Sequence, residues 1–120
     1  MSDSKVTLIE RYPNVVVVRV QAESLDETSL STVRADTSAA GAESPQLTVA
    51  LDLTKVGFLP SLSLGGLVQL QQEFKARGQR LVLSGLQQAV RETIAITRLD
   101  RLFEIHKDLS TLTGATGPTG

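Results

Sequence analysis

The chain has 120 residues, a formal net charge of −1, no cysteine and a single histidine. This length suits one domain, and the cysteine and histidine counts exclude a disulfide framework, a thiolate nucleophile and the usual zinc sites. The balanced charge and the scarcity of aromatic residues also argue against nucleic acid as a partner, because that binding needs basic surfaces and stacking platforms.

No apolar run approaches the ~18 residues of a transmembrane helix. Residues 1–5 lack the apolar core of a signal peptide. We therefore expect a cytoplasmic protein without a membrane partner, and we expect neither a metal nor a cofactor.

The first third of the chain predicts a hairpin and a helix. Residues 5–10 and the Val-rich residues 15–20 are two strands joined by a turn at Pro13, which favours antiparallel pairing. Ser24 and Glu27 fit a capping box, so a helix is expected to begin there and to end near Gly41 as its C′ residue.

The next elements alternate strand and helix. Residues 47–53 form a continuous apolar run, typical of a central parallel strand. Apolar residues then recur at helical spacing over 61–77, and Gly78 ends that helix. Gly65 and Gly66 inside it predict a close approach of the helix to the sheet.

The last third predicts a strand at 80–84, a helix at 86–97, a short strand at 102–106 and one helical turn at 107–112. The order β-β-α-β-α-β-α-β indicates an α/β domain with a single mixed sheet of about five strands and helices mainly on one face. We assign residues 1–112 to this domain and residues 113–120 to a flexible tail.

Two hydroxyls mark the turn between the strand at 47–53 and its helix. Ser61 and Ser63 lie where the helix begins, and a helix N-terminus favours negative charge, so a phosphate on either serine or a bound anion would be stabilised there. The alternative is structural, with Ser61 as an N-cap and Asp26 as an acidic residue that stabilises its own helix.

Three segments carry a resemblance to a known family. They are residues 51–65 with Asp52, Gly57, Phe58, Leu64 and Gly65, residues 78–91, and residues 99–105. With the order of elements, they resemble the STAS domain, which occurs in bacterial anti-sigma-factor antagonists, stressosome subunits and the tails of sulfate transporters.

The resemblance implies a site at the helix start. In antagonists this loop carries Asp-Ser/Thr-Ser-Gly, and a partner kinase phosphorylates one hydroxyl. Aligned on Phe58, this chain has Pro60 at the acid, Leu62 at the usual phosphoacceptor and Ser63 at the glycine. Ser61 and Ser63 are the remaining acceptors. Asp26 matches an acidic residue that the family places near the acceptor, and Arg98 stands where the family often has Gly.

The expected function is a non-enzymatic interaction domain that docks an anti-sigma factor or serine kinase. The docking loop implied by the resemblance comprises Phe58, Leu59, Pro60, Leu62, Leu64 and Gly65. Two alternatives are a small-ligand or anion sensor using the same helix start, and a constitutive scaffold subunit, which the apolar Leu62 would suit.

Overall fold

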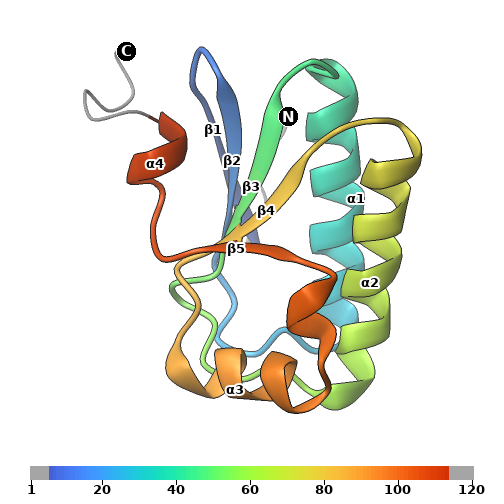
Figure 1. Cartoon of the computed structure of the whole chain (residues 1–120), viewed down its shortest axis with the longest axis vertical. Coiled ribbons are helices and arrows are strands. Elements are labelled where there is room, and N and C mark those ends of the chain that lie inside the picture. Colours follow the sequence, from blue (N-terminus) through green and yellow to red (C-terminus); the bar gives the residue numbers. More distant parts are fainter. Residues whose placement is uncertain (1–5, 114–120) are drawn as a thin grey trace.

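A computed structural model describes residues 6–113 and shows one five-stranded sheet (Figure 1). The strands lie in chain order across it: β1 (Thr7–Arg11), β2 (Val15–Val20), β3 (Thr48–Asp52), β4 (Leu81–Ser84) and β5 (Glu104–His106). Strands β1 and β2 are antiparallel, and every other neighbouring pair is parallel. The predicted mixed sheet with a hairpin at one edge is therefore confirmed.

The helices lie mainly on one face, as predicted. The long helices α1 (Glu27–Glu43) and α2 (Ser61–Ala76) run side by side over the sheet (Figure 1). The shorter α3 (Gln88–Ile96) and the 3-10 helix Leu99–Arg101 follow β4 at the carboxyl end of the parallel strands. This arrangement leaves the start of α2 at the same end of the sheet.

The second face of the sheet is covered in part by the short helix α4 (Ser110–Thr113). Its Leu112 packs with Val15, Val17, Ala50 and Val82, whereas Val16 and Val18 lie in the main core with residues of α1 and α2. Cover on both faces explains why all four β2 valines at 15–18 are buried. The predicted tail, apart from Thr113 at the end of α4, lies outside the described residues.

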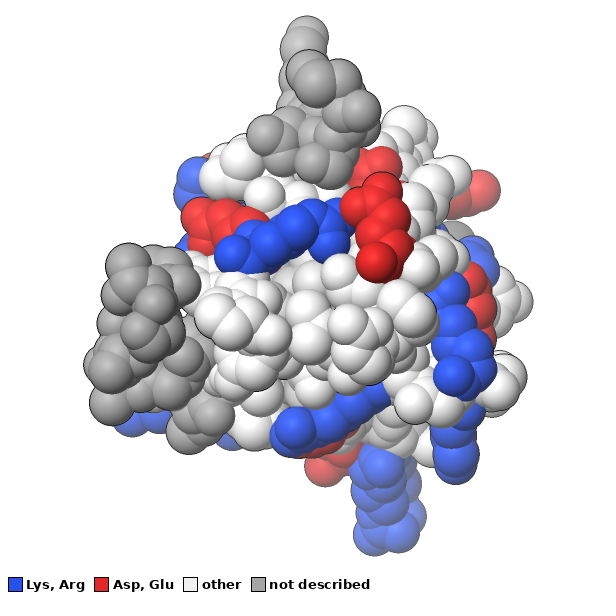
Figure 2. All heavy atoms as spheres, turned by 90° about the horizontal axis from the view of Figure 1, so that it is seen from above, with Lys and Arg blue, Asp and Glu red and all other residues white. Residues whose placement is uncertain are grey.

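The edge strand β5 is held by charged side chains as well as by its ladder. Arg80 pairs with Glu104, and this hydrogen bond, with a further one from His106, lowers the pKa of Glu104 to about 2. Basic and acidic side chains also alternate on the end of the molecule that Figure 2 shows. The described residues on that end therefore form no continuous basic patch.

Two expectations about glycines were wrong. Gly41 does not end α1 but lies inside it, and a Cβ there would come within 2.8 Å of Phe74 and Gln79. It lets the ends of α1 and α2 approach each other. Gly66 serves the same helix pair rather than the sheet, because a Cβ there would meet Leu30 Cδ2 at 2.5 Å. Gly65 faces open space.

Arg98 adopts a left-handed backbone conformation, with φ 61° and ψ 19°, directly after α3. This conformation costs an L-residue about 1 kcal/mol or more, whereas glycine adopts it freely. We therefore expect Arg98→Gly to raise the free energy of unfolding by about 0.5–1 kcal/mol, after allowing for the extra entropy of glycine in the unfolded chain. Urea denaturation measures the change.

Arg101→Gly is the matched control, since Arg101 lies in the 3-10 helix without a positive φ. It is expected to lower stability. Equal effects of the two substitutions would show that the backbone at Arg98 is not strained.

Candidate functional site

The segment between β3 and α2 is fixed beside the start of α1 by backbone hydrogen bonds. The amide of Leu25 donates to the carbonyl of Phe58 at 3.0 Å, and the amides of Gly57 and Phe58 donate to the carbonyl of Glu23 at 2.8 and 3.1 Å. This short bridge explains how segments more than thirty residues apart form one surface at the carboxyl end of the sheet.

The predicted docking residues divide into two groups. Leu59 and Leu64 are buried in the main core, where they anchor the segment. Phe58 is 61% exposed and Leu62 is 94% exposed, although the segment that carries them is anchored in the core by Leu59 and Leu64. The accessible members of this set are therefore Phe58, Pro60, Leu62 and Gly65.

The two serines also differ. Ser61 is the first residue of α2 and is exposed, whereas Ser63 is only 4% exposed. The structural alternative, in which Ser61 is the N-cap of α2, was wrong. The N-cap is Pro60, which makes no side-chain capping hydrogen bond. The amides of the first turn thus lack a side-chain partner, so the positive end of α2 is open to an anion.

Asp26, not Ser24, caps α1. Its carboxylate accepts a hydrogen bond from the amide of Ser29 at 2.9 Å. The predicted capping box was wrong because Ser24 pairs through its backbone with Phe58, three residues before α1 starts at Glu27. Asp26, the acidic residue that the resemblance implies near the acceptor, lines the same groove as Ser63.

We expect Asp26→Ala to lower the free energy of unfolding by about 1 kcal/mol, because it removes the side-chain acceptor of the helix N-terminus. Asp26→Asn keeps an acceptor and should lose only a few tenths. Thermal or urea unfolding compares the two, and Ser24→Ala is the control. A larger loss for Ser24→Ala than for Asp26→Ala would restore the capping box.

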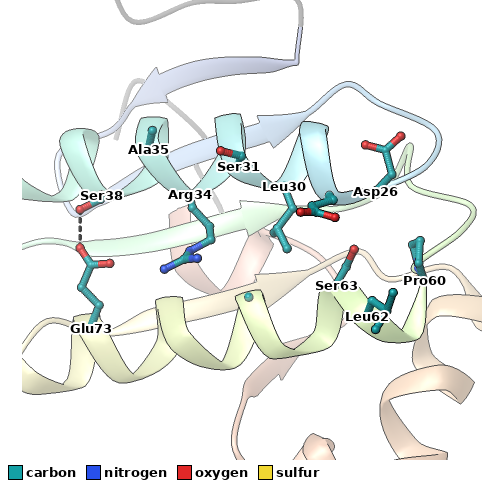
Figure 3. A pocket seen from close by; sticks show the side chains of 12 residues that line it. Asp26, Leu30, Ser31, Arg34, Ala35, Ser38, Pro60, Leu62, Ser63 and Glu73 are labelled. Atoms are coloured by element: carbon teal, nitrogen blue, oxygen red, sulfur yellow. Dashed lines mark hydrogen bonds between the residues drawn. The ribbon is translucent and has the colours of Figure 1, made fainter.

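An open groove of about 800 Å³ separates the outer sides of α1 and α2 (Figure 3). Asp26 and Pro60 lie at one end, and Glu73 accepts a hydrogen bond from Ser38 at the other. Between them the Arg34 side chain extends from α1 towards α2, over Gly66. Arg34 is not among the site residues expected from the sequence. Arg34 follows Leu30 by four residues, so the helical period places both on the same side of α1. That spacing could have indicated that Arg34 lies beside α2.

The groove and the rest of the described chain offer no metal site, since residues 6–113 contain no group of three or more His, Asp or Glu side chains placed to hold an ion. None of the helices in that range is long and apolar enough to cross a membrane. The start of α2 offers the exposed hydroxyl of Ser61, the exposed apolar side chain of Leu62 and a helix end without a side-chain cap.

A five-stranded sheet with an antiparallel hairpin at one edge and the long helices on one face defines a small α/β domain. A family model for the STAS domain matches residues 7–112, and the chain belongs to this family.

Solved STAS structures share the fold. An anti-sigma factor antagonist from Mycobacterium paratuberculosis matches with a TM-score of 0.75 and 24% identity, covering 95% of this chain and 93% of that one. An anti-sigma-factor antagonist (STAS) domain protein from Planctomyces limnophilus gives 0.73 and 20%, covering 88% and 92%. The unphosphorylated antagonist SpoIIAA gives 0.68 and 20%, covering 88% and 91%.

Proposed function

We propose that this chain is a protein-interaction domain of a bacterial, cytoplasmic partner-switching pathway. Its partner would be an anti-sigma factor with serine kinase activity, and its role would be regulatory rather than enzymatic. The family supports this proposal, because solved relatives of the same fold are anti-sigma factor antagonists, and SpoIIAA has been solved in both unphosphorylated and phosphorylated forms.

The observation that carries the proposal is the exposure of Leu62. It is 94% exposed on the first turn of α2, at the position where the family resemblance places the phosphoacceptor. Phe58 is 61% exposed on the segment leading to it, while Leu59 and Leu64 hold the segment rigid from below. Large apolar side chains that lie exposed together mark protein-interaction sites, and aromatic residues such as Phe58 are enriched in the cores of interfaces.

Ser61 is the serine that we propose as the phosphoacceptor, because its side chain is exposed and Ser63 is buried. A phosphate on Ser61 would add about −1.5 to −2 charges. That charge is favoured by the positive end of the α2 dipole, but burying it beside Leu62 in an apolar interface would cost its hydration free energy. Phosphorylation at Ser61 would therefore release a partner docked on Leu62 without unfolding the helix.

The test is to incubate the purified chain with a serine kinase of the anti-sigma type from the same organism and ATP, and to map phosphate by mass spectrometry. Phosphate on Ser61 that disappears in Ser61→Ala, but not in Ser63→Ala, is the expected result. Partner binding is measured in parallel with the unphosphorylated chain.

The other outcomes separate the remaining possibilities. Binding without any phosphorylation would leave the docking proposal standing and replace the switch by permanent docking, for which an apolar Leu62 is well suited. Stabilisation by small anions, without any protein partner, would favour a sensor that uses the open start of α2. Phosphate on Ser63 alone would contradict the assignment to Ser61.

A further inference from the structure

One side of α1 carries an acid, an apolar residue and a base at equal spacing. Asp26, Leu30 and Arg34 are four residues apart, so they share one side of the helix, and all three line the groove (Figure 3). At a rise of 1.5 Å per residue, Asp26 and Arg34 are about 12 Å apart with Leu30 midway. If a second copy of α1 lies antiparallel to the first, its Arg34 faces Asp26 of the first copy, and its Asp26 faces Arg34 of the first copy.

The charges at both ends of this stripe lack a partner of opposite charge within the described chain, although Asp26 also caps α1. No carboxylate of residues 6–113 pairs with the Arg34 guanidinium, and its Nε is buried without a hydrogen bond. Glu73, which also lines the groove, is held by Ser38 instead. Asp26 and Glu27, at the opposite end, form no ion pair with a described basic residue. A cation and two carboxylates are thus available in one groove.

The outer side of α1 is also unusually flat. Its exposed residues between Glu27 and Glu43 are small and uncharged: Thr28, Ser31, Ala35, Ala39 and Ala42. Glu43, the last residue of the helix, pairs with Arg11. Small side chains let a second helix come close and lose little conformational entropy when they are covered. Leu62, which borders the same groove, would be covered as well.

We infer that two copies of this chain associate through this face, with their α1 helices antiparallel about a two-fold axis near Leu30 and Ser31. Arg34 of each copy meets Asp26 and Glu27 of the other, so the ion pairs occur twice, as a closed two-fold interface requires. Because Leu62 borders the groove, the dimer and a complex docked on Leu62 exclude each other. The inference itself does not depend on the proposed partner.

Sedimentation equilibrium of the whole chain over a range of protein concentrations, at low and high salt, is the experiment. The expected result is a monomer–dimer equilibrium that weakens at high salt, because exposed ion pairs are screened. Arg34→Glu should raise the dimer dissociation constant about tenfold, since two ion pairs are replaced by repulsion. Glu27→Lys should act in the same direction. Arg91→Glu, an equal charge reversal on exposed α3, should have little effect.

The decisive arm mixes the two charge-reversed variants. Arg34→Glu and Glu27→Lys each repel themselves but complement each other, so an equimolar mixture should form heterodimers with an affinity near that of the unchanged chain. Circular dichroism confirms that both variants are folded. A chain that stays monomeric at every concentration, a dimer insensitive to Arg34→Glu, or a mixture that fails to restore association would overturn the inference.

Discussion

Leu62→Asp is expected to weaken partner binding about 30-fold or more while leaving the domain as stable as before. The loss follows from removing the most exposed large apolar side chain of the proposed docking surface and placing a charge in an apolar contact. Stability should hold because the Leu62 side chain is 94% exposed and an acidic residue in the first turn is favoured by the helix dipole. Calorimetric titration against the partner and urea unfolding give the two quantities.

Ile96→Asp is the matched control, since Ile96 is 81% exposed but lies at the end of α3, outside the docking segment. It should leave the affinity within a few fold of the unchanged chain. If Leu62→Asp bound as tightly as Ile96→Asp, the start of α2 would not be the docking surface.

Gln79→Leu is expected to cost about 2–4 kcal/mol of unfolding free energy, although it replaces one side chain by another of similar size. Gln79 is 5% exposed, and its amide nitrogen donates to the carbonyls of Gly41, Ser44 and Leu47 at 3.1, 3.0 and 2.9 Å. Leucine would remove the donor that these three carbonyls share, and in the described part of the chain only those of Gly41 and Ser44 also accept from a backbone amide, at Ser44 and Leu47. The connection from α1 to β3 would therefore lose the hydrogen bonds that hold it closed. Chemical denaturation measures the loss.

Gln72→Leu makes the same chemical change at an exposed position of the neighbouring helix, and should shift stability by no more than about 0.5 kcal/mol. A loss below about 1 kcal/mol for Gln79→Leu would mean that water replaces the amide and that the connection does not depend on it.

The strands were predictable because their signals are local. Val15–Val20 has the bounds expected from its run of β-branched residues, and the apolar run at 47–53 became the central strand β3. Gly78, with φ 70°, follows α2 as its helical period and stop signal indicated. Hydrophobic period and turn chemistry act within a few residues, so a sequence contains them in full.

The errors concern features that depend on contacts between distant segments. Ser24 has the spacing of a capping box, but its backbone pairs with Phe58, and the helix begins later at Glu27. Gly41 has the composition of a helix end, yet it is inside α1 because Phe74 needs the space of its missing Cβ. The partners in these contacts, Phe58 and Phe74, lie more than thirty residues away in the sequence, so a local pattern cannot indicate them.

The resemblance pointed to the segment between β3 and α2 as the candidate site, and Phe58 and Leu62 are exposed there. The burial of Ser63 and the position of Arg34 in the groove depend on how α1 and α2 pack, so no local pattern predicted them. Those two features decide which serine is accessible and which charge the groove presents.

Amide hydrogen exchange of the chain, alone and with its partner, tests the docking claim most directly. We predict slower exchange in residues 58–65 and the following first turns of α2 when the partner is bound, with β1 and the carboxyl end of α3 unchanged. Protection confined to other parts of the sheet, with residues 58–65 exchanging as in the free chain, would contradict the proposed docking surface.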